Sequence, residues 1–159
     1  MLLTLIIAVV LTAFITLLHY ELFRLLSRTL PPLQIASRTK VLVVLFAALA
    51  AHWLEILLYA LAYWLLDEGA QLGWLAGEAV SDFNDYLYFS ATSYTTLGVG
   101  DIYPTHALRL LAAAESLNGL LLIGWSASYT YLSMHRFWNV DDTAAHDDAK
   151  TIGHHMQGR

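Results

Sequence analysis

The chain has 159 residues, of which 58% are apolar and only 13% charged, and its formal net charge is −5. A soluble domain is usually nearer half apolar and a quarter charged, so this composition indicates a membrane protein. The chain has no cysteine, which excludes disulfides and thiolate metal sites, and its negative charge argues against nucleic-acid binding.

The first long apolar segment covers residues 2–18 and continues as an amphipathic stretch to residue 30. A helix needs about 20 residues to cross a hydrocarbon core of about 30 Å, so this segment predicts a membrane span. No positive leader precedes the segment and no small-residue cleavage site follows it. We therefore expect a retained helix and not a secretory signal that is removed.

Basic residues gather around Pro31 and Pro32, after this first span. They are Arg24, Arg28, Arg38 and Lys40, and the next basic residue is Arg109. The positive-inside rule places this linker in the cytoplasm. We therefore expect a multi-pass protein of the inner (plasma) membrane, with its N-terminus outside and its C-terminus in the cytoplasm.

The second predicted span, residues 41–66, contains two ionisable residues near its middle, His52 and Glu55. They lie three residues apart, on one helix face, and ionisable residues at this depth usually face the interior of a bundle. One interpretation is a proton-sensitive pair that couples pH to gating. We favour the alternative, a mutually satisfied pair that fixes helix packing. We expect no transition-metal site, because no third ligand is evident nearby.

An acidic loop follows this span and leads into a short apolar segment, residues 83–94. The five acids are Asp67, Glu68, Glu78, Asp82 and Asp85. They could concentrate cations at a pore mouth, or they could simply solvate the loop, and both roles are compatible. The short segment cannot cross a membrane, so we predict a re-entrant pore helix there.

The loop that follows reads Thr-Thr-Leu-Gly-Val-Gly-Asp-Ile-Tyr-Pro, from Thr95 to Pro104. Its alternating glycines allow backbone conformations in which successive carbonyls point the same way. Rings of carbonyls replace the hydration shell of a cation in the filters of ion channels. An ordinary glycine turn is the alternative. We predict a selectivity filter that binds ions through Thr96, Leu97, Gly98, Val99 and Gly100.

The third predicted span, residues 108–138, contains a carboxyl group and two glycines. Glu115 could face the back of the filter or the cavity, where a carboxylate would favour cations or bind a blocker, or it could be protonated and hydrogen-bonded. Gly119 and Gly124 are the weak points of this helix, because interior glycines often mark kinks. Bending at these glycines during gating and close helix packing are equally good explanations of them.

From Tyr86 onward, the sequence YLYFSATSYTTLGVGDIYP resembles the pore region of potassium channels. The likeness is to small bacterial channels of the two-transmembrane ion-channel family, and it covers roughly residues 52–138. It implies a homotetramer with K⁺ at the filter and with Asp101 as the acid at the filter mouth. Arg109 and Gly119 match the arginine and the hinge glycine of the family's inner helix.

Three positions depart from the family pattern. Val99 replaces the usual aromatic residue between the filter glycines, so potassium selectivity is less certain than cation conduction. Thr92 stands where some relatives have a glutamate, which removes a carboxyl link to Asp101. The loop between Asp101 and Arg109 is one residue shorter than in common relatives.

These observations predict an all-α integral membrane protein with three transmembrane helices, a re-entrant pore helix and a filter in each subunit of a tetrameric pore. We expect three parts: an extra N-terminal helix with its linker (1–38), a pore module (39–138) and a short cytoplasmic tail (139–159). The tail carries four aspartates and three histidines. The histidines could sense pH or bind a metal weakly, but we favour a disordered, solvating segment.

The predicted function is passive conduction of monovalent cations, with a preference for potassium. The expected partners are three further copies of the chain and the lipid bilayer; we expect neither an enzymatic activity nor a cofactor besides permeant K⁺. Two alternatives stay open. One is a weakly selective cation channel, and the other is a non-conducting regulatory subunit.

Overall fold

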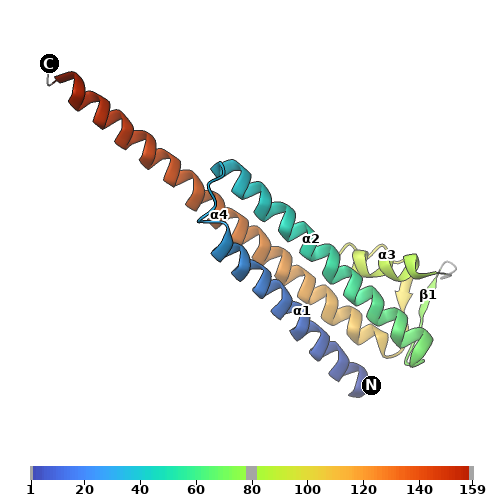
Figure 1. The fold of residues 1–159 in the computed structure, drawn as a ribbon. Helices are drawn as coiled ribbons and strands as arrows, with labels where there is room; N and C mark the ends of the chain where they lie inside the picture. The colour runs from blue at the N-terminus through green and yellow to red at the C-terminus, as the bar shows by residue number, and fades with distance from the viewer. Residues whose placement is uncertain (1, 78–81, 158–159) are drawn as a thin grey trace.

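The chain folds into a bundle of long helices with one short helix packed against it (Figure 1). The computed structural model describes the backbone of residues 2–77 and 82–157 and the side chains as far as Phe137. The four helices are α1 (Leu2–Thr29), α2 (Ser37–Trp64), α3 (Phe83–Tyr94) and α4 (Leu108–Gln157).

Three of these helices are long and apolar enough to cross a membrane. The candidate spans are Leu2–Thr29, Ser37–Gly69 and Leu108–Phe137, where the second includes a π-helical turn at Leu65–Gly69. The three predicted spans are therefore confirmed, and the chain is a multi-pass membrane protein. Large apolar side chains remain exposed along the helices, for example Val10, Phe14 and Leu132, as expected of surfaces that meet lipid or other subunits.

The prediction of an all-α fold is wrong in one detail. Strands β1 (Leu75–Gly77) and β2 (Ile102–Pro104) pair antiparallel, with Leu75 opposite Pro104 and Gly77 opposite Ile102. A Cβ on Gly77 would lie 1.9 Å from the carbonyl oxygen of Asp101, so only glycine allows this approach. The pair ties the acidic loop to the segment that follows the predicted filter.

The tail is also different from the prediction. Helix α4 continues through the expected boundary at residue 138 and ends at Gln157, so residues 139–157 are helical and not a disordered tail. Figure 1 shows this part of α4 projecting beyond the ends of α1 and α2. The side chains of the three tail histidines lie outside the described residues.

Polar contacts attach α1 to the other helices across the apolar core. The Thr12 hydroxyl lies 3.2 Å from the hydroxyl of Tyr59, and the Thr16 hydroxyl donates to Oδ1 of Asn118 at 3.1 Å. Nearer the other end of α1, Ser27 and Tyr129 share a hydrogen bond of 2.7 Å. Hydrogen bonds of this kind hold helices together where lipid removes the hydrophobic drive to associate.

Candidate functional site

The loop after α3 folds back onto the C-terminal end of that helix. The amide of Thr96 donates to the carbonyl of Ser93 at 3.0 Å, and the amide of Gly98 donates to the carbonyl of Thr92 at 3.1 Å. At the other end of α3, Asp82 and Asp85 form a capping box, so two of the acids in the outer loop start the helix. The two amide contacts fix the loop at the C-terminal end of α3, and the capping box fixes where the helix begins.

The backbone of the predicted filter alternates between two kinds of conformation. Thr96, Gly98 and Gly100 have φ values of 58°, 56° and 89°, whereas Leu97 and Val99 do not have positive φ. Glycine adopts such angles readily, but a threonine there costs about 1–2 kcal/mol. Backbone strain of this kind persists where the surroundings enforce it and is common at functional sites. This alternation is the geometry that a line of carbonyls on one side of a loop requires.

The side chains of this loop project away from the described chain. Leu97 is 69% exposed and Val99 is 56% exposed. Irregular backbone at membrane depth is tolerated only where protein surrounds it or where it lines a watery cavity. The exposed loop of one chain is therefore expected to be covered by other chains.

Asp101, predicted at the filter mouth, has a partner that the sequence did not reveal. Its Oδ2 accepts a hydrogen bond of 2.9 Å from the hydroxyl of Tyr88, and its Oδ1 accepts one from the amide of Ile102. This bond to Asp101 raises the pKa of the Tyr88 hydroxyl, which therefore stays a donor. Tyr88 lies one helical turn before Thr92, so a tyrosine makes the link that the missing glutamate would have made.

If the loop acts as the predicted filter, replacing Tyr88 with phenylalanine is expected to make the ionic currents decay faster during sustained opening. The change removes the donor that holds Asp101 beside α3 and leaves the ring in place. Single-channel or macroscopic recording in planar bilayers measures the decay. The matched control is Tyr103→Phe, at an exposed tyrosine two residues after Asp101. Equal decay in the two variants would contradict this role.

Glu115 packs inside the helix bundle of the single chain. Its side chain is fully buried between α2, α3 and α4, where Oε1 accepts from the Ser90 hydroxyl at 2.6 Å and Oε2 accepts from the Tyr63 hydroxyl at 2.5 Å. These hydrogen bonds agree with the alternative interpretation, and protonation of Glu115 stays a prediction. Glu115 joins three helices behind the predicted filter.

Glu115→Gln is therefore expected to leave conductance and block unchanged. Glu115→Ala is expected to destabilise the protein by about 1–3 kcal/mol for each buried donor that it leaves unpaired. Bilayer recordings measure the first effect, and thermal unfolding of purified protein measures the second. A changed conductance in Glu115→Gln would mean that the charge of Glu115 acts on conduction.

The two glycines of α4 differ in their surroundings. A Cβ on Gly119 would lie 2.2 Å from the carbonyl oxygen of Tyr94, whereas a Cβ on Gly124 would meet nothing within 4 Å. Gly119 is thus a point of close packing between α4 and the end of α3. Of the two explanations left open for these glycines, packing applies to Gly119, and bending during gating stays a prediction for Gly124.

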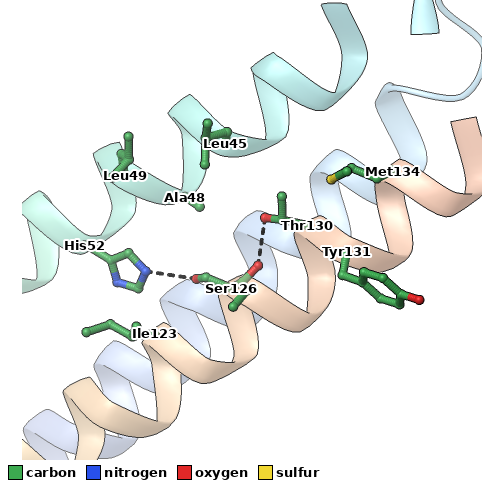
Figure 2. Close-up of a pocket in the computed structure, with 10 residues that line it drawn as sticks. Leu45, Ala48, Leu49, His52, Ile123, Ser126, Thr130, Tyr131 and Met134 are labelled. Carbon is green, nitrogen blue, oxygen red and sulfur yellow. Dashed lines mark hydrogen bonds between the residues drawn. The ribbon is translucent and has the colours of Figure 1, made fainter. Parts of the chain in front are cut away.

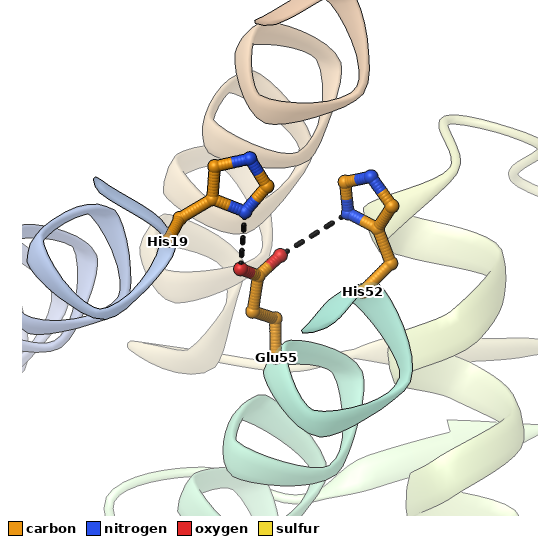
Figure 3. A group of neighbouring side chains, drawn as sticks. All are labelled: His19, His52 and Glu55. Atoms are coloured by element: carbon orange, nitrogen blue, oxygen red, sulfur yellow. Dashed lines mark hydrogen bonds and ion pairs between the residues drawn. The ribbon is translucent and has the colours of Figure 1, made fainter. Parts of the chain in front are cut away.

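His52 and Glu55 belong to a larger buried cluster (Figure 3). His52 Nδ1 lies 3.2 Å from Glu55 Oε2, and His19 Nδ1, from α1, lies 2.7 Å from Glu55 Oε1. The Tyr94 hydroxyl also donates to Glu55, and the Ser126 hydroxyl contacts Nε2 of both imidazoles. These contacts fit the packing role that we favoured, and the coupling of pH to gating stays a prediction.

Sequence reasoning missed His19 because it lies 36 residues before Glu55 in a different span. A histidine inside an apolar helix was the available signal. The structure removes the reason for excluding a metal site, since a third possible ligand is present.

More than half of the chain matches a known protein family. A family model described as ion channel matches residues 40–131, which is more than half of the chain and covers most of α2, all of α3, the loop and much of the spanning part of α4. Helix α1 lies before the matched residues. No curated protein and no solved structure matches the chain at a significant level. This chain therefore belongs to the two-transmembrane ion channel family.

Proposed function

We propose that four copies of this chain form a channel that conducts cations and prefers potassium. The observation that carries the proposal is the alternating backbone of residues 96–100 at the end of a helix too short to cross the membrane. In the proposed channel, α3 is the pore helix and the loop after it is the filter. Conduction is passive and involves no catalysis.

The proposed ion ligands are the carbonyl oxygens of Thr96, Leu97, Gly98 and Val99, together with the hydroxyl of Thr96. Carbonyls in this arrangement replace the water around a dehydrated K⁺. The C-terminal end of α3 adds a negative partial charge on the side of the central cavity. Asp101 adds a carboxylate at the mouth.

A homotetramer follows from the number of loops. One loop cannot encircle an ion, and the chain carries one such loop. A closed ring of identical subunits is the simple solution. The exposed side chains of Leu97 and Val99 would then pack against neighbouring subunits.

The orientation deduced from the basic residues completes the proposal. The linker between α1 and α2 and the extended end of α4 lie in the cytoplasm, and the filter mouth with Asp101 lies outside. Asp67 of the outer loop also lies on this outer side, where it accepts hydrogen bonds from the amide of Leu75 and the hydroxyl of Tyr86. Glu78 of the same loop lies outside the described residues.

Val99 supports a second candidate, a channel that discriminates weakly between potassium and sodium. Valine has no hydroxyl to bond to α3, and its side chain is half exposed in the single chain. Reversal potentials under opposed potassium and sodium gradients separate the two candidates. A potential close to the potassium equilibrium value supports the selective channel, and a potential close to zero supports the weakly selective one.

A further inference from the structure

We propose that His19, His52 and Glu55 form a binding site for a divalent transition metal such as Zn²⁺ inside the helix bundle. Each residue offers one ligand atom, and the three atoms lie within 4.8 Å of one another. His19 comes from α1, and the other two residues come from α2. Two imidazoles and one carboxylate form a ligand set found in catalytic zinc sites.

The geometry needs little adjustment to accept an ion. Zinc binds histidine nitrogen and carboxylate oxygen at about 2.0–2.2 Å, which places tetrahedral ligand atoms about 3.3 Å apart. The Nδ1 atoms of His19 and His52 already lie 2.7 and 3.2 Å from the two oxygens of Glu55. Figure 3 shows both rings turning Nδ1 toward the carboxylate, so small side-chain rotations suffice.

One hydroxyl group contacts the Nε2 atoms of both imidazoles. The Ser126 Oγ lies 3.2 Å from Nε2 of His19 and 2.9 Å from Nε2 of His52. Histidines that bind a metal usually donate their other N–H to an oxygen, which fixes the tautomer. A hydroxyl has two lone pairs and can accept from both rings. Ser126 thus favours the tautomers in which both Nδ1 atoms present a lone pair, and the Tyr94 hydroxyl, 2.9 Å from His52 Nδ1, would lie beside the ion.

The hydrogen atoms of the cluster also indicate a missing cation. Two contacts join imidazole Nδ1 to the carboxylate and two join imidazole Nε2 to the hydroxyl, so four hydrogens are needed. When both Nε2–H groups donate to Ser126, two neutral imidazoles supply two of these hydrogens, and none remains between either Nδ1 and the ionised carboxylate of Glu55. A metal ion bound to both Nδ1 atoms would remove this deficit, and so would a proton on each Nδ1. Buried groups without partners are costly, so the cluster favours one of the two occupants.

A surface pocket leads to the cluster. It has a volume of about 360 Å³ and is lined by apolar side chains of α2 and α4, with His52, Ser126 and Thr130 as polar groups. Figure 2 shows His52 and Ser126 together at the edge of this pocket, joined by their hydrogen bond. The His52 side chain is 15% exposed, whereas His19 and Glu55 are fully buried, so His52 is the point of entry.

The ligand types select the class of metal. Calcium and magnesium prefer sets made of oxygen alone, whereas imidazole suits zinc, copper and nickel. The site therefore takes a borderline transition metal and not an alkaline-earth ion.

A metal ion at this site is expected to affect gating, an expectation that rests on the proposed channel function. The ligands connect α1 to α2, while Ser126 belongs to α4 and Tyr94 ends α3 beside the predicted filter. A bound ion would hold four helices together. We expect it to inhibit opening.

The test measures metal binding directly. The protein is purified without a histidine tag, in a background where the tail histidines His146, His154 and His155 are changed to glutamine. It is placed in lipid nanodiscs and titrated with Zn²⁺ against a chromogenic chelator. The expected stoichiometry is one tightly bound ion per chain. Absence of tight binding would overturn the proposal.

Variants of the same background locate the ion. Glu55→Gln and His19→Gln are expected to weaken binding on the order of 100-fold, and Ser126→Ala about 10- to 100-fold. The control His135→Gln, at an exposed histidine of α4, is expected to bind as the background does. Equal binding in Glu55→Gln would place the ion elsewhere.

Two further measurements keep the test decisive. If a ligand variant fails to fold, Co²⁺ is bound to the background protein and its visible spectrum is recorded. Strong absorption, typical of a tetrahedral site of nitrogen and oxygen ligands, supports the proposal. A weak octahedral spectrum contradicts it. Potassium flux is then recorded with and without Zn²⁺. Absence of flux without zinc would count against the channel function alone, because binding is measured independently.

Discussion

Replacing Gly98 with alanine is expected to abolish potassium flux while the protein still folds and assembles. Gly98 has a φ of 56°, where an alanine costs about 1–2 kcal/mol, and four copies of that cost would meet in one ring. The loop relieves the strain by turning its peptide groups, which moves carbonyls away from the ions. The strained Thr96 two residues earlier leaves the loop little room to absorb a second unfavourable residue.

Flux of K⁺ into liposomes measures this effect, and size-exclusion chromatography checks assembly. The matched control is Gly69→Ala, since a Cβ at Gly69 meets nothing within 4 Å and its φ is not positive. The control is expected to conduct like the wild type. Normal flux through Gly98→Ala would mean that the conformation of this glycine is not needed for conduction.

The second large effect is expected at Gly119. A methyl group there would lie 2.2 Å from the carbonyl oxygen of Tyr94 and 3.0 Å from Cγ of its ring. Because the closest atom belongs to the backbone, α4 must move away from the end of α3. Overpacking in a core costs about 1–3 kcal/mol, and a backbone clash belongs at the upper end. We expect Gly119→Ala to lower the melting temperature clearly and to disturb conduction.

Gly124→Ala is the natural control, because the same methyl group meets nothing within 4 Å. Alanine in place of an interior glycine can stabilise a helix by up to about 1 kcal/mol, so this variant is expected to be at least as stable as the wild type. Thermal unfolding of both proteins in one detergent makes the comparison. Equal melting temperatures would contradict close packing at Gly119. An altered open probability in Gly124→Ala at unchanged stability would support bending there.

The features that the sequence predicted well are local ones. The three spans depend on continuous apolar runs, and the alternating backbone of residues 96–100 depends on two glycines that only a special conformation explains. The bounds of α3 also follow from local signals, since Asp82 and Asp85 cap its start. Only the left-handed conformation of Thr96 was unexpected within this loop.

The features that were missed depend on contacts between distant segments. His19 meets Glu55 only because α1 packs against the matched pore module, and Tyr88 reaches Asp101 only because the loop folds back onto α3. The burial of Glu115 likewise depends on Tyr63 from another helix. The tail was predicted to be disordered from its charge, whereas in the structure it continues α4, a continuation that no cap or proline interrupts.

The most direct test of the account is ion flux through purified protein in liposomes, first with a potassium gradient and then with a sodium gradient. The account predicts flux with potassium and little or none with sodium, and loss of the potassium flux in Gly98→Ala. Equal flux of the two ions would contradict potassium preference and assign a loosened filter to Val99. Absence of flux with either ion, over a range of pH and voltage and with metal chelated, would contradict the channel function itself.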